Sequence, residues 1–450
     1  MGSRGNDAGA GPRFCRLDSL VTESHTTPRP DLYTDLVWRG LIHQITSEAF
    51  IPGWLGSGSR TLYVGFDPTA DSLHVGSLLP LMMLRRFQRA GHKPVALVGG
   101  ATGMIGDPSG KSEERNLLSV ETLRDNVAGM DRQLRRFLDF DQGPNAALLV
   151  NNFDWMRKLS YLEFLRDVGK NFPVNVMLAR ESVKNRIDRE SGISYTEFSY
   201  MLLQAYDFVH LSDATGCELQ VGGSDQWGNI TAGIDLARRM RGRQLYGLTC
   251  PLLTTADGQK MGKTEKGAVW LDPKRTSPYA FYQYWINVAD ADVSRCLRFL
   301  TELTREEIEF QESTAREAGA AQKRLAESLT ELVHGADGLA AATRASEIFF
   351  GASIENLDDG QLGEIFADVP SQELPRAQLD AGLPLIDALV ASGLSKSKGE
   401  VRRKIDEGGV YVNNLRCADK DRRLTAADLA SKTMLVLRLG RKNYALLRFV

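Results

Sequence analysis

The stretch Leu62-Tyr63-Val64-Gly65-Phe66-Asp67-Pro68-Thr69 continues through His74-Val75-Gly76-Ser77 into an apolar segment that starts at Leu78. Its first five residues are apolar or small, which predicts a buried strand. The apolar spacing of residues 78–89 predicts a helix, and Gly91 is placed to end it. The stretch therefore predicts a strand, a polar turn and a helix in direct succession.

Three more apolar runs predict strands at residues 94–98, 147–150 and 218–221. Strands that alternate with helices form a parallel sheet with right-handed crossovers. Residues 31–255 are therefore predicted to fold as an α/β domain around a parallel sheet. Such open sheets bind ligands at the carboxyl ends of their strands, and the polar motifs described below follow those ends.

The rest of the chain has a different pattern, and 450 residues predict two to four domains. Residues 1–30 are rich in Gly, Ser, Thr and Pro and are expected to form a flexible tail. Residues 290–380 show helical spacing, with a capping-box pattern at Thr304-Arg305-Glu306-Glu307. A helical domain is therefore predicted to follow the sheet.

Mixed polarity and two prolines predict a linker at residues 372–384. The last segment is predicted to combine a basic helix at 396–406 with strands at 409–413 and 434–439. Residues 391–450 contain 14 Lys and Arg against six Asp and Glu, a net charge of +8. The whole chain carries −2, so residues 1–390 carry −10. A basic module on an acidic body indicates either a polyanionic partner or a solvated basic surface.

Composition excludes several classes of protein. Hydrophobic residues make up 42 % and charged residues 25 % of the chain, which is typical of a folded soluble protein. The longest apolar run, residues 78–84, is far shorter than the ~20 residues of a spanning helix, so no membrane attachment is expected. The five cysteines are far apart and form no Cys-x-x-Cys pair, so no bound metal and a reducing compartment are expected.

The turn after the first strand places His74 and Gly76 at the start of a helix. Free amides and positive potential at a helix N-terminus favour phosphate, and a glycine lets a nucleotide approach the backbone. The pattern alone is equally consistent with a surface histidine that caps a helix. A second polar loop, Lys260-Met261-Gly262-Lys263-Thr264, could close over a triphosphate or be a solvated turn.

A third motif, Gly99-Gly-Ala-Thr-Gly103-Met-Ile-Gly-Asp107-Pro-Ser-Gly-Lys111, ends like a phosphate-binding P-loop. The P-loop pattern requires glycine where Ile105 stands, and Pro108 removes an amide from the cradle. The carboxylate of Asp107 suits a cation, such as an amino-acid ammonium group, better than a phosphate.

Two further patterns indicate the walls of a pocket. Tyr200, Gln204 and Asp207 follow each other at i, i+4 and i+7, which places them on one face of a predicted helix. Gly222-Gly223-Ser224-Asp225-Gln226-Trp227-Gly228-Asn229 joins a strand to a helix, and Asp225 could accept hydrogen bonds from ribose. The alternatives are a wet face of an amphipathic helix and a glycine-rich turn capped by aspartate.

His74 and Lys260 lie 186 residues apart, and the order of their two motifs resembles the signature pair of class I aminoacyl-tRNA synthetases. Together the five motifs, with Phe281-Tyr-Gln-Tyr-Trp-Ile-Asn287, resemble bacterial tyrosyl-tRNA synthetases from about residue 31 to the C-terminus. The resemblance implies a Rossmann-like catalytic domain at 31–289 that contains a dimerisation insertion. It also implies a helical, anticodon-side domain at 290–380 and a small α+β, S4-like RNA-binding domain at 383–450.

The resemblance further implies the reaction and its partners. L-tyrosine and ATP, which brings Mg²⁺ as part of the substrate, would form tyrosyl-adenylate and pyrophosphate, and tyrosine would then pass to the 3′ end of tRNA(Tyr). The resemblance also implies a homodimer located in the cytoplasm. One departure stands at Ser77, where the family's first signature usually has a second histidine.

The resemblance implies a role for each candidate residue. The catalytic set is His74, Lys260, Lys263, Thr264, Lys111 and Arg115. The tyrosine-binding set is Tyr63, Asp107, Tyr200, Gln204, Asp207 and Gln226. The ATP-binding set is Gly65, Asp67, Thr69, Gly76, Ser77, Gly223, Asp225 and Lys263, and the RNA-binding set is Lys396, Lys398, Arg402, Arg403 and Lys404.

Two other functions are consistent with part of the sequence. A nucleotidyltransferase acting on a small metabolite would share the His-x-Gly turn, but it needs neither the basic module nor the helical domain. An RNA-binding relative without activity is consistent with Ser77, but the presence of Asp107, Asp225, Lys260 and Lys263 argues against loss of catalysis.

Overall fold

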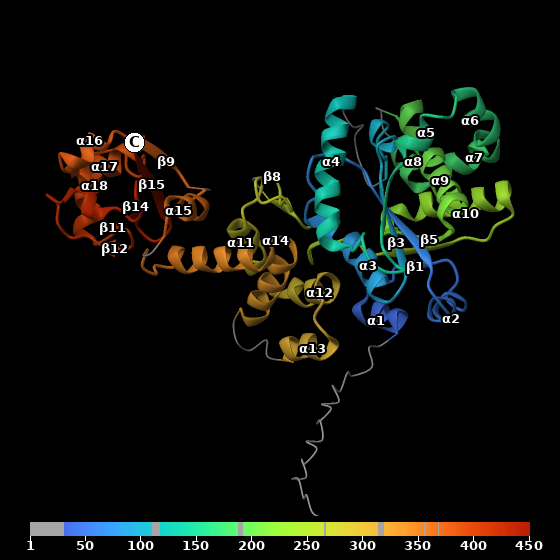
Figure 1. Cartoon of the computed structure of the whole chain (residues 1–450), viewed down its shortest axis with the longest axis horizontal. Coiled ribbons are helices and arrows are strands. Elements are labelled where there is room, and N and C mark those ends of the chain that lie inside the picture. Colours follow the sequence, from blue (N-terminus) through green and yellow to red (C-terminus); the bar gives the residue numbers. More distant parts are fainter. Residues whose placement is uncertain are drawn as a thin grey trace, which may run out of the picture.

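The computed structural model describes residues 31–109, 118–187, 192–264, 267–313, 319–354, 357–367 and 369–450. The predicted tail at 1–30 and the candidates Lys111 and Arg115 lie outside these ranges. Figure 1 shows three parts arranged side by side: a sheet covered by helices, a group of helices, and a small C-terminal part that contains a second sheet.

The first part is built on a six-stranded sheet with strand order β1-β6-β5-β2-β3-β4. Five strands are parallel, and β1 pairs antiparallel with β6 at one edge. The strands are β1 (Gln44–Ile45), β2 (Thr61–Phe66), β3 (Lys93–Val98), β4 (Leu148–Asn151), β5 (Cys217–Gly223) and β6 (Tyr246–Cys250). The predicted parallel sheet is therefore confirmed, as are the four strands predicted for it.

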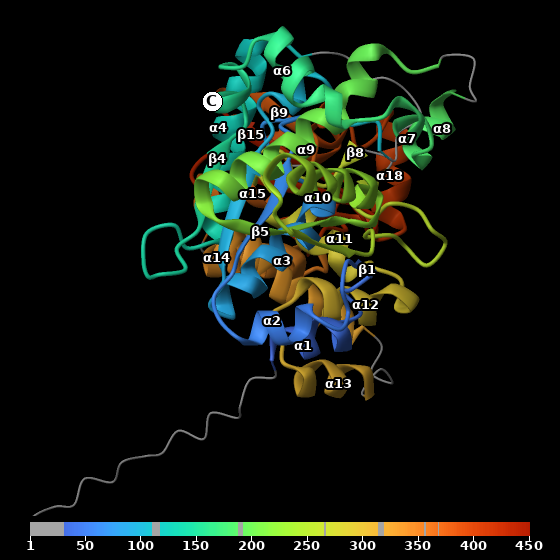
Figure 2. The ribbon, with the colours of Figure 1, turned by 90° about the vertical axis from the view of Figure 1, so that its right-hand side faces the viewer.

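Helices cover both faces of this sheet. They are α3 (Leu78–Arg89) and α4 (Val120–Phe137) on one face, and α9 (Tyr195–Thr215) and α10 (Trp227–Arg241) on the other. Figure 2 looks onto the second face and shows α9 and α10 in front of β5. Helices α1 (Leu32–Arg39) and α2 (Ile51–Gly56) precede β2.

Alternation along β2 decides which side chains reach each face. Leu62, Val64 and Phe66 belong to the hydrophobic core on the side of α3 and α4, whereas Tyr63 belongs to the core on the side of α9. Successive side chains of a strand point to opposite faces, so Tyr63 alone among these residues packs against Phe208 of α9, with ring centroids 5.3 Å apart.

An insertion between β4 and α9 contains four short helices: α5 (Phe153–Met156), α6 (Tyr161–Asp167), α7 (Val174–Leu178) and α8 (Glu181–Ile187). The start of α9 is set by Ser194, whose side chain accepts a hydrogen bond from the amide of Glu197, and its end by Gly216 at φ = 68°. This helix brings the predicted pocket face beside β2.

The helical part consists of α11 (Pro278–Ile286), α12 (Asp290–Leu300), α13 (Arg305–Ser313), α14 (Ala320–Phe349) and α15 (Asp359–Ile365). The predicted capping box is confirmed, because Thr304 and Glu307 exchange hydrogen bonds between side chain and backbone at 2.8 and 3.2 Å. Helix α14 is kinked at Gly335 (φ = 77°). Its first half, with α11 and α12, shares one hydrophobic core with α3 and the sheet.

The C-terminal part has a five-stranded sheet with order β12-β11-β14-β15-β9. Its elements are β9 (Ser371–Leu374), α16 (Arg376–Asp380), β10 (Leu383–Pro384), α17 (Leu385–Ala391), α18 (Lys398–Asp406), β11 (Val410–Val412), β12 (Leu415–Arg416), β13 (Arg423–Leu424), β14 (Met434–Leu439) and β15 (Asn443–Phe449). The basic helix and the strands predicted near 409–413 and 434–439 are confirmed.

The prediction of a linker at 372–384 is wrong. Strand β9 pairs in parallel with β15, and Leu379 of α16 is fully buried in the core of the C-terminal part. The amide of Arg376 also donates to the carbonyl of Val450. Prolines and mixed polarity are typical of loops, but they also suit the edge strand of a sheet. The strand that pairs with β9 lies about 75 residues away in the sequence, so a local pattern cannot reveal the pairing.

Candidate active site

Two hydrogen bonds within residues 74–77 close the turn that follows β2. The Nδ1 atom of His74 accepts a hydrogen bond from the amide of Gly76 at 3.0 Å, and the amide of Ser77 donates to the carbonyl of His74 at 2.7 Å. A Cβ atom at Gly76 would lie 2.7 Å from Cε1 of His74, so a side chain there would displace the imidazole. Ser77 occupies the N-cap position of α3 without a capping hydrogen bond from its side chain.

The loop at 260–264, here called the phosphate loop, lies against this turn although it is 186 residues away. The amide of Val75 donates to the carbonyl of Val269 at 2.9 Å, and the amide of Val269 donates to the carbonyl of Gly262 at 2.8 Å. Gly262 has φ = 83°, and a Cβ there would lie 2.7 Å from Cβ of Val75. Close backbone contact therefore joins the two predicted signatures, and glycine is required at their junction.

A cavity of about 570 Å³ opens between the turn, the phosphate loop and the carboxyl ends of β2 and β5. This volume is within the range of small-molecule sites. Sixteen predicted residues line it: Tyr63, Gly65, Asp67, Thr69, His74, Gly76, Ser77, Asp107, Tyr200, Gln204, Asp207, Gly223, Asp225, Gln226, Lys260 and Lys263. Thr264 lies beside the cavity on β7 (Lys263–Thr264), where its hydroxyl donates to the carbonyl of Gly267.

The deep end of the cavity is formed by Tyr63 and Asp207. The hydroxyl of Tyr63 is buried and has no hydrogen-bond partner among the described residues. Burial raises its pKa well above the usual value, and the nearby Asp207 adds to this effect. An unpartnered buried hydroxyl is costly to the protein alone, which indicates that a ligand supplies the missing partner.

Asp207 is also buried, and two side-chain donors fix its carboxylate. Its two carboxylate oxygens accept hydrogen bonds from Nδ2 of Asn152 at 3.0 Å and from Nε1 of Trp155 at 2.9 Å. Burial raises the pKa of Asp207 to about 7, while the two hydrogen bonds act in the opposite direction. The carboxyl group is therefore fixed in place and titrates near neutral pH.

A chain of amides occupies the next level of the cavity. Nε2 of Gln226 donates to Asp107 at 2.8 Å, and Oε1 of Gln226 accepts from Nε2 of Gln204 at 3.2 Å. Oε1 of Gln204 is buried without a partner among the described residues. Gln204 of α9 and Asp107 of the segment after β3 are thus linked through Gln226 in the wall of the same cavity, and both bring acceptor oxygens of the kind that a cationic group requires.

Tyr200 and Asp67 form a second polar pair. The hydroxyl of Tyr200 donates to Asp67 at 3.1 Å, and the hydroxyl of Thr102 donates to the other oxygen of Asp67 at 2.9 Å. A Cβ at Gly99 would lie 2.3 Å from both Asp67 and Thr102. Asp67 was predicted as a nucleotide contact, and the structure shows it engaged in holding Tyr200.

The segment after β3 does not form a phosphate cradle within its described residues, 99–109. Residues 102–104 form a short 3-10 helix, and the amides of Gly103 and Gly106 donate to the carbonyls of Gly99 and Thr102. These amides are therefore unavailable to a phosphate. The segment instead brings Asp107 to the cavity wall.

Several functional residues were missed at the sequence level: Thr102, Asn152, Trp155 and Gln220. Gln220 lines the cavity from β5, and its Oε1 is buried without a partner among the described residues. Asn152 and Trp155 directly follow β4. The rule that ligands bind at the carboxyl ends of strands could have pointed to them.

The basic residues of the C-terminal part lie far from the cavity along the chain, on and just before α18. Lys396, Lys398, Arg402 and Arg403 are exposed, and Lys404 is half-buried. Lys398 pairs with Asp387 at 2.6 Å, and Lys404 with Glu407 at 2.7 Å. Lys396 and Arg402 make no ion pair with any other described residue.

Among the described residues, no cluster of three or more His, Cys, Asp or Glu side chains is arranged to hold a metal ion. In the same part of the chain, no helix is both long and apolar enough to cross a membrane.

Comparison with known proteins identifies relatives over nearly the whole length. A family model described as tRNA synthetases class I (W and Y) matches residues 57–351, and one described as tyrosine–tRNA ligase SYY-like C-terminal domain matches residues 361–447. The tyrosine–tRNA ligase of Rhodopirellula baltica is 63 % identical over 432 residues, covering 95 % of this chain and 98 % of the relative. That of Geobacillus stearothermophilus is 51 % identical, covering 93 % and 100 %.

A solved structure is similar as well. The C-terminally truncated mitochondrial tyrosyl-tRNA synthetase of Aspergillus nidulans superposes with a TM-score of 0.64 at 32 % identity, covering 71 % of this chain and 94 % of that one. The second family match begins at residue 361, ahead of the segment predicted as a linker. This agrees with the place of β9 and α16 in the C-terminal sheet.

The raised pKa of Asp207 predicts a pH-dependent effect of Asp207→Asn on stability. Between pH ~4 and ~7 the folded protein holds a proton that the unfolded chain releases, so wild-type stability falls as pH rises through this window. The neutral variant lacks this loss. From pH 5 to pH 8 its free energy of unfolding should therefore gain about 2–3 kcal/mol relative to wild type.

Urea denaturation of both proteins at the two pH values measures this gain. The exposed Asp154 provides a matched control, because Asp154→Asn should show the same difference from wild type at both pH values. If Asp207→Asn also shows equal differences at pH 5 and pH 8, then Asp207 is not protonated in the folded protein and the prediction is wrong.

Proposed function

The chain belongs to the class I tRNA synthetases of the tryptophan and tyrosine group and ligates tyrosine to tRNA, and we propose that the cavity beside β2 carries out the chemistry. Tyrosine is first activated with ATP to tyrosyl-adenylate, and the tyrosyl group then passes to the 3′ end of tRNA(Tyr). The observation that carries the proposal for the cavity is the buried, unpartnered Tyr63 hydroxyl next to Asp207.

Recognition of the substrate phenol is assigned to Tyr63 and Asp207. A phenol can donate to the Asp207 carboxylate and accept from the Tyr63 hydroxyl at the same time. Phenylalanine would leave the buried Tyr63 hydroxyl without a partner and would offer no donor to the buried Asp207, which carries a desolvation penalty. The indole of tryptophan offers a single donor and no acceptor, so the same pair disfavours it.

The amino-acid ammonium group is assigned to Asp107, Tyr200 and Gln204, and Gln226 to the neighbourhood of its carboxylate. The unpartnered Oε1 of Gln204 and the charge of Asp107 support an ammonium site. Because the Tyr200 hydroxyl donates to Asp67, which Thr102 holds in turn, its position is set before the substrate arrives. A preorganised site loses less freedom on binding.

ATP is assigned to the mouth of the cavity. Gly65, Asp67, Thr69, Gly76, Ser77 and Gly223 would border the nucleotide, Asp225 would accept from its ribose, and His74 would donate to a phosphoryl oxygen. A Cβ at Gly223 would lie 2.8 Å from Oδ1 of Asp225, so a side chain there would displace the Asp225 carboxylate. Mg²⁺ is expected to enter with ATP as part of the substrate.

Activation is an in-line displacement in which the tyrosine carboxylate attacks the α-phosphorus and pyrophosphate leaves. Such a reaction depends on positioning and on neutralising the charge of the leaving group. Lys260 and Lys263 are exposed on the phosphate loop at the rim of the cavity, which supports this role for them, with Thr264 beside them. Lys111 and Arg115 are proposed to assist, although both lie outside the described residues.

Ser77 stands where the family's signature usually has a second histidine. It directly precedes α3 at the cavity wall, so its hydroxyl can donate to a phosphoryl oxygen. A serine cannot carry positive charge. His74 and the two lysines are therefore proposed to supply the electrostatic stabilisation.

The C-terminal part is proposed to bind the tRNA through α18 as an S4-like module. Its net charge of +8 over residues 391–450 and the unpaired exposed side chains of Lys396 and Arg402 support contacts with phosphates. The four cysteines in the described residues, Cys217, Cys250, Cys296 and Cys417, are free and buried, which supports the proposed cytoplasmic location.

A homodimer is proposed, with the insertion between β4 and α9 at its interface. Large apolar side chains are exposed together on α6, α7 and the start of α9: Tyr161, Leu162, Val174, Val176, Leu178 and Tyr195. Exposed apolar surfaces of this kind mark protein–protein interfaces. A second copy of the chain is the proposed partner.

The reaction is tested by ATP–pyrophosphate exchange. Exchange should depend on L-tyrosine, and neither L-phenylalanine nor L-tryptophan should support it. Asp207→Ala should lower the preference for tyrosine over phenylalanine by about 30-fold or more, because a charge-assisted hydrogen bond to the phenol is lost. Asp154→Ala serves as the control on an exposed carboxylate. Unchanged discrimination in Asp207→Ala would refute its role.

The RNA contact is tested by reversing two charges on or beside α18. Lys396→Glu combined with Arg402→Glu should raise the KM for tRNA about tenfold or more and leave tyrosine-dependent exchange unchanged. The exposed Lys323 of α14 provides a matched charge reversal, and Lys323→Glu should alter neither reaction. Equal loss of exchange and charging in the double variant would contradict a separate RNA-binding role.

The dimer is tested by sedimentation. The wild-type protein should sediment at twice the mass of one chain, and Leu162→Asp combined with Tyr195→Asp should sediment as a monomer, since two charges would be buried at the interface. Phe310→Asp places a charge on an equally exposed aromatic of α13 and should remain dimeric. A dimeric double variant would exclude this surface as the interface.

A further inference from the structure

The phosphate loop continues from the second strand of a β-hairpin in which residues 253–255 pair with residues 259–261. The amide of Met261 donates to the carbonyl of Leu253 at 2.9 Å, Thr254 pairs with Lys260, and the amide of Thr255 donates to the carbonyl of Gln259 at 2.7 Å. Both lysines at the cavity therefore depend on this hairpin. Lys260 lies on its second strand, next to the final paired residue Met261, and Lys263 follows three residues after Lys260. Whatever holds the hairpin sets the position of the two charges.

Helix α12 contacts both strands of the hairpin through two consecutive residues. Nη2 of Arg295 donates to the carbonyl of Thr254 on the first strand. The thiol of Cys296 contacts the sulfur of Met261 on the second strand at 3.7 Å, and both of these side chains are buried. Helix α12 thus lies directly beneath the hairpin.

The guanidinium of Arg295 is itself held in place. Asp292, one turn earlier on α12 and 3 % exposed, accepts from the same Nη2 atom at 2.6 Å. The side chain of Arg295 is half-buried, and its Nε has no partner among the described residues. A buried carboxylate paired with a planar guanidinium gives a directional contact, since the guanidinium donors have fixed geometry.

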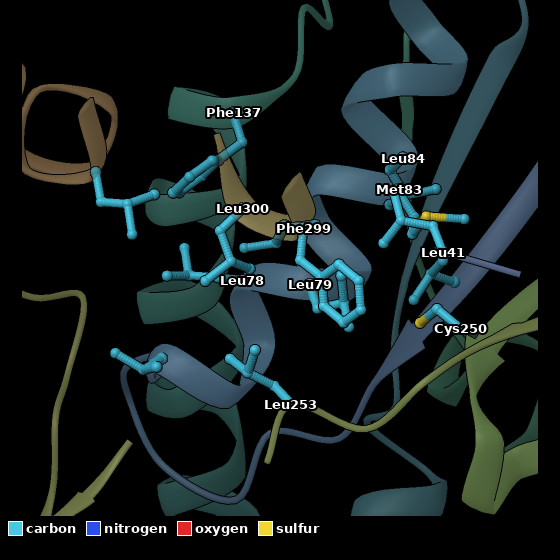
Figure 3. Packing of buried hydrophobic residues seen from close by; sticks show 14 of the residues in the cluster. Leu41, Leu78, Leu79, Met83, Leu84, Phe137, Cys250, Leu253, Phe299 and Leu300 are labelled. Atoms are coloured by element: carbon cyan, nitrogen blue, oxygen red, sulfur yellow. The ribbon is translucent and has the colours of Figure 1, made fainter. Parts of the chain in front are cut away.

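Helix α12 is in turn fixed to the helix that begins at Ser77. Arg86 of α3 donates to the carbonyls of Phe299 and Thr301 at 3.1 and 2.7 Å, and Arg39 of α1 donates to the carbonyl of Leu303 at 2.7 Å. Figure 3 shows Phe299 and Leu300 beside Leu78 and Leu79 in the core that these helices share. The support of the hairpin is thus rigidly connected to the His74 turn.

We propose that Arg295, oriented by Asp292, is a positioning residue for the phosphate loop: its bond to the carbonyl of Thr254 holds the hairpin so that Lys260 and Lys263 face the cavity. Arg295 does not itself line the cavity. It acts through the two lysines, and this inference rests on the proposed role of those lysines in activation.

Arg295→Lys is the variant of choice, because it keeps a positive charge for the buried Asp292 but removes the planar guanidinium whose Nη2 donates to both Thr254 and Asp292. In tyrosine-dependent exchange, kcat should fall about tenfold while the KM for L-tyrosine stays within about twofold of wild type. The tyrosine site is built from β2, α9 and β5, which Arg295 does not touch. In a Lys263→Ala background, Arg295→Lys should cause a smaller further loss than in wild type, because only Lys260 then depends on the hairpin.

Tryptic cleavage of the folded protein after Lys260 and Lys263 gives a readout that does not depend on activity. Arg295→Lys should speed this cleavage about tenfold, because the hairpin opens more often. Arg298→Lys is the matched control on the next turn of α12, where Arg298 pairs with Glu312 at 2.7 Å, and it should change neither cleavage nor kcat.

The outcomes separate this inference from the proposed function. If wild type shows no tyrosine-dependent exchange, the proposed function fails, and cleavage still tests the anchoring of the hairpin. If wild type exchanges and Arg295→Lys matches it in kcat and cleavage, the inference is wrong. Equal losses in kcat, tyrosine affinity and melting temperature, or full additivity with Lys263→Ala, also refute it. Should Arg295→Lys not fold, Cys296→Ala tests the second anchor, with the same pattern expected at about threefold.

Discussion

Two backbone hydrogen bonds, from Val75 to Val269 and from Val269 to Gly262, hold the phosphate loop against the turn after β2. The rest of the cavity depends on this contact, because it brings the His74 turn and two lysines to the same mouth. Gly262 makes the contact possible, since any side chain there would collide with Val75. Helix α12 supports the arrangement from below through Arg295 and Cys296.

The deep end of the cavity illustrates a conflict between stability and binding. The protein buries an acid at Asp207 and leaves the Tyr63 hydroxyl without a partner, and both choices cost free energy in the absence of ligand. Asn152 and Trp155 reduce that cost by donating to the carboxylate and at the same time fix its direction. This cost is what the proposed recognition of a phenol would recover, since a phenol can donate to Asp207 and accept from Tyr63.

Much of the fold was accessible to local patterns. The alternation of apolar strands and helical spacing predicted the parallel sheet, and the capping box at Thr304 and the basic helix near residue 400 were confirmed. Most candidate site residues line one cavity because each follows the carboxyl end of a strand or lies on one face of α9. The prediction of a linker at 372–384 is wrong because β9 is defined by its pairing with β15, which is distant in the sequence and leaves no local pattern.

The sequence by itself determined the periodicities, the polar turns at strand ends, the family resemblance, and the face of α9 that carries Tyr200, Gln204 and Asp207. Only the tertiary structure decided that Asp67 holds Tyr200, that Asn152 and Trp155 hold Asp207, and that α12 carries the phosphate-loop hairpin. The physical reason is that spacing encodes which residues share a face of one element. Which residue completes a hydrogen bond or fills a buried contact depends on elements that only folding brings within about 3 Å of each other.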